Sequence, residues 1–317
     1  MKTLRKYTHI NAGTIEEAEA ALAKGNAMVN AGGSDLVGTM RFEILPNYPE
    51  TVVNLKTITP SLDYIKEEGG ILKIGAMTRL EDIAMSSVVH DGWTALAEAA
   101  HKTASPHIRE IGTIGGNICQ LNRCWYFRKP ENMFDCLRKG GGMCYAMMGE
   151  NRYHSIYGAV GGCVAVNPSD TAPALVALGA TIVTSKREIS VADFWTVAFP
   201  GSTVLDADEI VTEIQVPAFS GKSAFVKFAL RTSIDFPLVN CAAAIGGSTA
   251  SICLNAVSCV PYKLTAAEES IAGKTIDEAS AEAAGATAAQ GTIPLVYNKW
   301  RIQVAKGMVK KAILACK

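Results

Sequence analysis

Four cysteines crowd into one glycine-rich stretch near the middle of this 317-residue chain, and they constrain its fold more than any other feature. They are Cys124, Cys136, Cys144 and Cys163. No apolar secretion signal opens the chain, so we expect thiols held for a metal or cluster rather than for disulfides. Glycines at 140–142 and 161–162 would let loop ligands wrap around a bulky inorganic core. The residues alone leave three alternatives open: an iron–sulfur cluster, a zinc site and unligated thiols.

The remaining cysteines are scattered singly, which fits reduced thiols. Cys119 directly follows a glycine turn, and we expect it to be inert or a substitute ligand. His154 lies between the third and fourth clustered cysteines, and a hydrogen bond to the cysteine loop is expected there rather than ligation. The other thiols should be buried as small apolar residues: Cys241, Cys253, Cys259 and Cys316.

The composition excludes several classes of protein. Hydrophobic residues make up 49% and charged residues 19% of the chain, which indicates a globular protein with a large core. Basic and acidic residues balance at 30 each, and no basic run is interleaved with aromatic residues, so nucleic acid is not an expected partner. No segment reaches the roughly 18 apolar residues that span a bilayer. The cytoplasm is the default location, although a partner subunit could carry the chain across a membrane.

Helix and strand patterns alternate along the chain, which indicates an α/β or α+β fold. Thr14 and Thr78 each precede a glutamate by three residues, the spacing of a capping box that opens a helix. The last helix should present one buried face formed by Val296, Trp300, Val304 and Met308. Other predicted elements are strands at 27–32, 51–55, 209–217, 224–231 and 241–247, a strand, turn and helix over 71–84, a helix over 94–102, and a helix followed by a strand over 170–185.

Two glycine turns are candidate anion sites, because glycine lets backbone amides approach a ligand without a Cβ in the way. They are AGGSDL at 31–36 and TIGGN at 113–117. Neither has the GxGxxG pattern, and the chain has no GxxxxGK[ST] motif, so the fingerprints of a Rossmann or P-loop site are missing. Taken singly, each could be an ordinary turn.

Five segments in order closely resemble the FAD-binding medium subunit of the xanthine dehydrogenase family of molybdenum enzymes. They are AGGSDL, LKIGAMTRLEDI, SPHIREIGTIGGNI, NPSDTAPALVALGA and EIVTEIQVP. The resemblance implies an α+β chain: a two-subdomain FAD-binding fold of the vanillyl-alcohol oxidase type, then a carboxy-terminal α+β domain with an antiparallel sheet and helices. We expect subdomains at 1–57 and 58–217, an iron–sulfur insert at 119–165, and the last domain at 222–317.

Most medium subunits of this family run straight from GGNI to the SD pair, whereas this chain inserts the cysteine stretch between them. Such an insertion resembles those of 4-hydroxybenzoyl-CoA reductase β subunits and of the periplasmic aldehyde oxidoreductase flavin subunit, where it binds a [4Fe-4S] cluster. The resemblance therefore implies the ligands Cys124, Cys136, Cys144 and Cys163. RCWYFR and GENRYHSIYG…CVAVNPSD match the aldehyde oxidoreductase type more closely than the reductase type, because the last cysteine lies well beyond the third. The carry-over is strongest for Cys124 and Cys163.

The same resemblance implies the residues that contact FAD. Ala31, Gly32, Gly33, Ser34, Asp35 and Leu36 would form the pyrophosphate loop, and Thr113, Gly115, Gly116 and Asn117 would close the second side. The remaining implied contacts are Asp170, Ile210 and Lys227. Two alternatives stay open: Asp170 could simply cap the helix that follows it, and Lys227 could be a surface lysine.

The resemblance implies an electron relay with FAD and [4Fe-4S], and no general acid or base of its own. Substrate would react at a molybdopterin in a large partner subunit, a small partner subunit would carry [2Fe-2S] clusters, and a ferredoxin or other carrier would exchange electrons with the complex. A dimer of heterotrimers is the expected assembly. The alternatives are a stand-alone FAD-dependent reductase that uses a nicotinamide, and a zinc-stapled scaffold without flavin. The substrate is left open.

Overall fold

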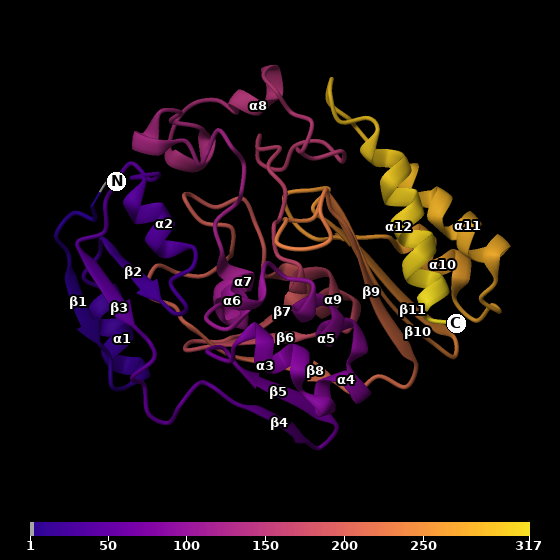
Figure 1. Ribbon diagram of the computed structural model, residues 1–317, viewed down its shortest axis with the longest axis horizontal. Coiled ribbons are helices and arrows are strands. Elements are labelled where there is room, and N and C mark those ends of the chain that lie inside the picture. Colours follow the sequence, from indigo (N-terminus) through magenta and orange to yellow (C-terminus); the bar gives the residue numbers. More distant parts are fainter. Residues whose placement is uncertain (1–2) are drawn as a thin grey trace.

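The computed structural model describes residues 3–317, and its first part is a small parallel sheet. The strand order is β1-β3-β2, with β1 at Thr8–Asn11, β2 at Ala27–Asn30 and β3 at Thr51–Asn54. Helix α1 (Ile15–Leu22) packs against β3 and is capped as predicted, because the Thr14 hydroxyl accepts a hydrogen bond from the Glu17 amide at 3.2 Å. Helix α2 (Leu36–Arg41) begins at the end of the first glycine turn. This part lies at the indigo end of Figure 1.

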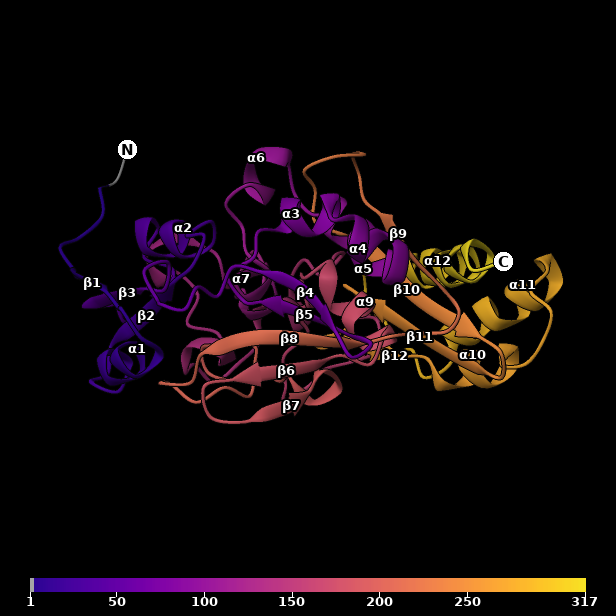
Figure 2. The same cartoon turned by 90° about the horizontal axis from the view of Figure 1, so that it is seen from below.

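The second part is a five-stranded antiparallel sheet whose core is the largest in the chain. Its order is β4-β5-β8-β6-β7, with β4 Ile65–Glu68, β5 Ile71–Gly75, β8 Val211–Pro217, β6 Thr181–Thr184 and β7 Glu188–Ser190. Figure 2 shows the helices of this part stacked on one side of the sheet. They are α3 (Leu80–Met85), α4 (Ser87–Gly92), α5 (Thr94–His101), α6 (Pro106–Arg109), α7 (Ile114–Cys119) and α9 (Thr171–Ala177).

The third part is a four-stranded antiparallel sheet covered by three helices. The order is β12-β11-β10-β9, with β9 Lys222–Phe228, β10 Val239–Gly246, β11 Thr249–Asn255 and β12 Tyr262–Lys263. The helices are α10 (Thr265–Ile271), α11 (Glu278–Ala286) and α12 (Arg301–Ala315). Separate parallel and antiparallel sheets with helices make this an α+β chain, as predicted.

The cysteine stretch forms an irregular lobe at the top of Figure 1. Its regular elements are 3₁₀ turns at Pro130–Asn132 and Leu137–Lys139 and the short helix α8 (Tyr145–Met148). The lobe is tied to the third part, because the Asn298 side-chain amide donates to the carbonyls of His154 and Ser155 at 3.0 and 2.8 Å. These contacts hold a loop-rich segment that has little secondary structure of its own.

Two predictions about helices are wrong. The last helix begins at Arg301, so Val296 and Trp300 lie before it and are 79% and 40% exposed. Its buried face is formed by Arg301, Ala305, Met308, Val309, Ala312 and Ile313. Thr78 does not cap α3, because its hydroxyl bonds instead to the Tyr64 backbone amide and carbonyl.

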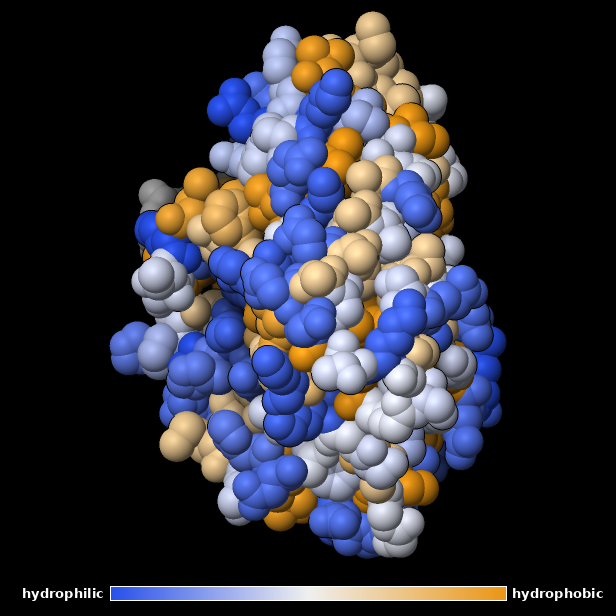
Figure 3. Space-filling view, turned by 90° about the vertical axis from the view of Figure 1, so that its right-hand side faces the viewer, coloured by the Kyte–Doolittle hydropathy of each residue, from blue (hydrophilic) through white to orange (hydrophobic). Residues whose placement is uncertain are grey.

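Within residues 3–317, no helix is both long and apolar enough to cross a membrane. The face that carries α11 and α12 is shown in Figure 3, where hydrophilic side chains are spread widely and apolar ones gather in small groups.

Candidate functional site

A cavity of about 470 Å³ lies where the first glycine turn meets helix α7, and its size is in the range of small-molecule sites. The walls come from segments far apart in the sequence, including the β2–α2 turn, residues 112–121 and the 234–236 loop. All the residues predicted to contact FAD line this cavity except Lys227: Ala31, Gly32, Gly33, Ser34, Asp35, Leu36, Thr113, Gly115, Gly116, Asn117, Asp170 and Ile210. The structure thus brings together two glycine turns that the sequence separates.

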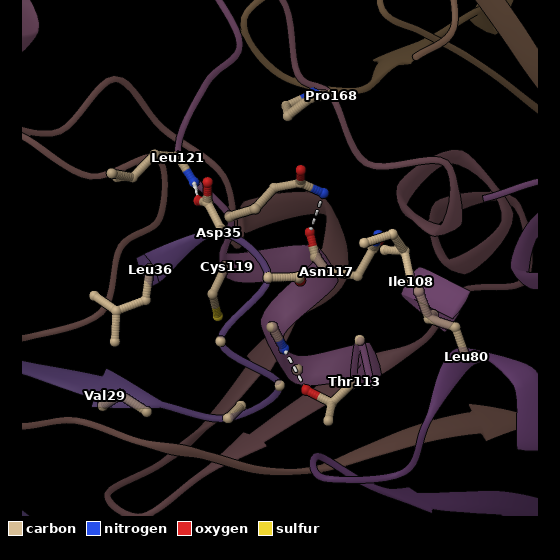
Figure 4. Close-up of a pocket in the computed structure, with 18 of the residues that line it drawn as sticks. Val29, Asp35, Leu36, Leu80, Ile108, Thr113, Asn117, Cys119, Leu121 and Pro168 are labelled. Carbon is tan, nitrogen blue, oxygen red and sulfur yellow. Dashed lines mark hydrogen bonds between the residues drawn. The ribbon is translucent and has the colours of Figure 1, made fainter. Parts of the chain in front are cut away.

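The first glycine turn touches the residues that lead into the second. A Cβ on Gly32 would lie 1.9 Å from the Ile111 carbonyl oxygen, so only glycine allows this approach. Gly33 has a φ of +73°, which also favours glycine. At the second turn the Thr113 hydroxyl caps α7 by accepting from the Gly116 amide at 3.1 Å, as drawn in Figure 4. Gly32 therefore permits the contact with Ile111, and Gly116 faces the cavity.

The Asp35 carboxylate fixes the segment that follows α7. It accepts hydrogen bonds from the Leu121 amide at 3.0 Å and from Arg128 Nη1 at 2.7 Å, and Arg123 Nη2 lies 3.2 Å away. Burial alone would raise the pKa of Asp35, but the two guanidinium groups and the amide hold it below its usual value. Asp35 thus remains an anion that orients two cations at the cavity wall.

Arg123 is a cavity residue that the sequence analysis missed. It lines the cavity, and its guanidinium lies 4.8 Å from the ring centroid of Phe236, another lining residue. Burial lowers its pKa to about 10, so it stays cationic at neutral pH. Its position directly before the first clustered cysteine was the only sequence signal available.

Asp170 and Lys227 form a buried ion pair behind the cavity. Lys227 Nζ lies 2.7 Å from Asp170 Oδ2, and the Asn240 amide donates to Oδ1 at 2.8 Å. The Lys227 side chain is 8% exposed, so the surface-lysine alternative is wrong. Asp170 precedes α9 but makes no side-chain capping bond, which removes the capping alternative. Lys227 reaches the cavity only through Asp170.

The hydroxyls near Asp170 hold the second turn in place. Asn117 Oδ1 accepts from Ser169 Oγ at 2.5 Å and from Thr171 Oγ1 at 2.8 Å. These bonds connect α7 to the start of α9. Segments on either side of the cysteine lobe are therefore joined at the cavity wall.

The four clustered cysteines line one narrow cavity next to the large one. Cys124 and Cys163 have side-chain nitrogen neighbours: His154 Nε2 lies 3.2 Å from the Cys124 sulfur, and Arg138 Nε lies 3.2 Å from the Cys163 sulfur. Hydrogen bonds from the Cys144 and Cys259 thiols and the Arg138 charge lower the pKa of Cys163, although burial opposes this shift. The structure thus brings the four predicted ligands together.

Within residues 3–317, no three or more histidine, cysteine or acidic side chains converge on a point that could hold a single metal ion. A zinc ion needs sulfur ligands about 2.3 Å from one centre, whereas a cluster spreads its thiolates around a larger body. Three buried nitrogens near the cysteines lack a hydrogen-bond partner among the described residues: Lys139 Nζ, Asn122 Nδ2 and His154 Nδ1. Lys139 Nζ lies 5.2 Å from the centroid of the Phe127 ring. A buried ammonium and amide without acceptors would suit an anionic group beside the cysteines.

Two other cysteines are placed differently from the clustered four. Cys119 lines the large cavity, and burial raises its pKa to about 12, which indicates an inert thiol. Cys259 is buried as expected, but its thiol lies 2.8 Å from the Ala165 carbonyl oxygen and 3.1 Å from that of Cys163. Cys259 therefore supports the loop of the fourth clustered cysteine, a contact that no local sequence pattern indicates.

Comparisons with known proteins agree with this geometry. A family model described as "FAD binding domain in molybdopterin dehydrogenase" matches residues 5–219, and one for the CO dehydrogenase flavoprotein C-terminal domain matches residues 224–316. The aldehyde oxidoreductase FAD-binding subunit PaoB of Escherichia coli is 30% identical, over 91% of this chain and 92% of its own. The carbon monoxide dehydrogenase medium chain of Hydrogenophaga pseudoflava is 26% identical, over 95% and 94%.

A solved structure of carbon monoxide dehydrogenase from Hydrogenophaga pseudoflava, lacking the Mo-pyranopterin moiety, is similar with a TM-score of 0.75 and 25% identity. The match covers 99% of this chain and 98% of that one. The predicted fold class is therefore confirmed. Both curated relatives are named as a subunit or a chain of a larger enzyme, which does not favour the stand-alone reductase.

Proposed function

The chain belongs to the family of FAD-binding subunits of molybdopterin dehydrogenases, and from this premise we propose that it is the electron-transfer subunit of a molybdenum-dependent oxidoreductase complex. One observation carries the proposal: Arg123 lines the large cavity and the next residue, Cys124, lines the cavity of the four cysteines. Two sites for redox groups would thus lie on either side of one short segment.

FAD would occupy the large cavity. The glycine turn at 31–36 would offer main-chain amides, and Arg123 a cation, to the pyrophosphate. The amides of residues 114–117 already donate to the protein, so the second turn would contribute a close backbone wall. Ile210 would supply apolar wall, while Asp170 would offer a carboxylate oriented by Lys227. Flavin chemistry supplies exchange of electrons singly or in pairs, which connects substrate oxidation to one-electron carriers. The chain itself would bind, orient and shield the cofactor.

A [4Fe-4S] cluster would be held by the four clustered cysteines. Soft thiolates suit iron–sulfur clusters, and the unpartnered Lys139 ammonium would compensate part of the negative charge. Arg138 adds a second buried cation against Cys163. The chemistry that such a cluster supplies is one-electron exchange with neighbouring carriers.

We propose the following partners for the complex. A molybdopterin-binding large subunit would carry out the reaction on the substrate, and a small subunit would supply [2Fe-2S] clusters. The present chain would pass electrons between that subunit and an outside carrier such as a ferredoxin. A dimer of heterotrimers is the proposed assembly, and the cytoplasm the proposed location.

Cofactor analysis of the anaerobically purified full-length chain tests this function. We expect one flavin and about four iron per chain. Cys136→Ser should lower the iron content and leave flavin bound, whereas Gly116→Val should lower flavin and leave iron. Cys316→Ala, at the end of α12 and away from both cavities, is the control and should change neither. Zinc without iron would reject the cluster, and a colourless protein without FAD would reject the flavin site.

A further inference from the structure

The imidazole of His154 is buried beside the first clustered cysteine. It is 3% exposed, and its Nε2 lies 3.2 Å from the Cys124 sulfur. Nδ1 has no well-aligned hydrogen-bond partner among the described residues, and the other polar group close to the ring is the Asn151 backbone. A metal-bound thiolate can only accept, and the contact therefore requires the proton on Nε2.

The position of this imidazole is fixed by the third part of the chain. The His154 carbonyl accepts from Asn298 Nδ2 at 3.0 Å and from a guanidinium nitrogen of Arg301. The ring itself packs edge-on against Trp125, with the centroids 5.8 Å apart. The hydrogen bonds therefore hold the His154 backbone, and the contact with Trp125 limits rotation of the ring away from Cys124.

Arg138 makes the equivalent contact at the fourth clustered cysteine. It is 2% exposed, and its Nε lies 3.2 Å from the Cys163 sulfur. Its Nη1 donates to the Gly201 carbonyl at 2.8 Å and to Ser202 Oγ at 3.1 Å, which holds the guanidinium plane. Two of the four sulfurs thus face a rigid side-chain N–H group.

We propose that His154 and Arg138 are positioning residues that raise the reduction potential of the cluster through N–H···S hydrogen bonds to Cys124 and Cys163. This inference rests on the proposed function, because it needs a cluster on the four cysteines. Hydrogen bonds and positive charge at the ligand sulfurs stabilise the reduced state most, since that state carries more negative charge. The potential of this cluster is therefore set from within the chain.

An EPR-monitored redox titration of the full-length chain, with iron content measured in parallel, tests the inference. His154→Phe keeps an aromatic ring and removes the N–H donor, whereas His154→Gln can keep a donor. We expect the midpoint potential of His154→Phe to fall, with about a tenfold change in the ratio of reduced to oxidised cluster at a fixed potential, which is 59 mV for one electron. His154→Gln should stay near the wild type.

Arg138→Met should lower the potential likewise, and Arg152→Met is the control. Arg152 belongs to the same lobe, but its side chain is 53% exposed and pairs with Glu150. An unchanged midpoint potential in both His154→Phe and Arg138→Met at full iron content overturns the inference. Loss of iron from both His154 variants also overturns it, because His154 is then a ligand. If only His154→Phe loses iron, the test rests on Arg138→Met: a lowered midpoint potential supports the inference, and an unchanged one overturns it.

A wild-type chain that contains iron while its variants keep the same potential would remove this inference and leave the proposed function standing. A wild-type chain without iron would remove the proposed function first, and the inference with it.

Discussion

Glu209 is a buried carboxylate in the wall of the large cavity, and its pKa is strongly shifted by its neighbours. It lines the large cavity, yet all four of its hydrogen bonds go to the protein. Burial alone would raise its pKa, but hydrogen bonds from Arg187, Thr184 and the Asp206 amide lower the pKa to about 2. The carboxylate thus stabilises the cavity wall through these hydrogen bonds and is not needed to bind a ligand.

Acid should therefore weaken the folded chain through Glu209. The folded-state pKa lies below the unfolded value of 4.5, so the folded chain binds fewer protons than the unfolded one. This contribution is complete above pH 4.5, and it is lost as the pH falls toward 2. We expect Glu209→Gln to remove about 2 kcal/mol of pH-dependent stability between pH 6 and 3, measured as the free energy of unfolding, because pH 3 still lies above the folded-state pKa. Glu188→Gln, an exposed carboxylate on β7, should leave the slope unchanged.

The roles of some single residues could not be predicted from the sequence, because they depend on tertiary contacts. The roles of Arg123 and Cys259 depend on which distant segments meet, and no local pattern carries that information. Lys227 was open to a surface interpretation because lysine is seldom buried, and only the positions of Asp170 and Asn240 remove it. In contrast, the glycine turns were predictable, because a turn demands glycine whatever it contacts.

Helices α11 and α12 pack closely, and each contains one glycine. Only the glycine of α11 lies in the contact between the helices. A Cβ on Gly285 of α11 would lie 2.7 Å from the Lys306 carbonyl oxygen of α12, whereas a Cβ on Gly307 would meet nothing within 4 Å. Gly285 therefore permits the contact between the helices, and Gly307 only lowers helix propensity.

The pair gives a matched test at this scale. We expect Gly307→Ala to raise the free energy of unfolding by about 1 kcal/mol, because alanine loses less backbone entropy in a helix. Gly285→Ala should lower it by about 1–3 kcal/mol, because the helices must move apart. Chemical denaturation of both variants measures the two effects. Equal shifts in one direction would contradict the packing described.

Most elements were predictable, and the failures have physical causes. The strand, turn and helix over 71–84 and the helix and strand over 170–185 have clear periodicity and turn residues, and they occur as β5, α3, α9 and β6. The Val296 and Trp300 stripe failed because four-residue spacing continues through an irregular segment before the helix starts. The Thr78 cap failed because a tertiary bond to Tyr64 takes its hydroxyl.

At the scale of the whole molecule, the buried guanidinium of Arg301 connects the cysteine lobe to the third part of the chain. Arg301 is fully buried and donates to the carbonyls of His154, Leu238 and Ala256. These groups belong to the cysteine lobe, to the start of β10 and to the segment after β11. Burial lowers the Arg301 pKa to about 10, which still leaves it charged at neutral pH. The lobe thus depends on the last helix for its position.

Arg301→Met should therefore destabilise the cysteine lobe, although the lobe is distant from Arg301 in the sequence. We expect a loss of about 3 kcal/mol or more, because three buried carbonyls lose their donor, and faster protease cleavage within residues 119–165. Limited proteolysis with mass spectrometry locates the cuts. Arg152→Met, an exposed pair in the same lobe, should leave the cleavage rate unchanged. Cleavage confined to other segments would show that Arg301 does not anchor the lobe.

Consecutive residues, Arg123 and Cys124, open onto different cavities. Their α-carbons are about 3.8 Å apart across one peptide unit, a length that no domain motion alters. The two proposed redox sites would therefore keep this covalent link through any domain motion of the complex. Regulation of electron transfer in this subunit would then act more directly on the reduction potentials of the carriers, or on which protein docks outside, than on the distance between the two sites.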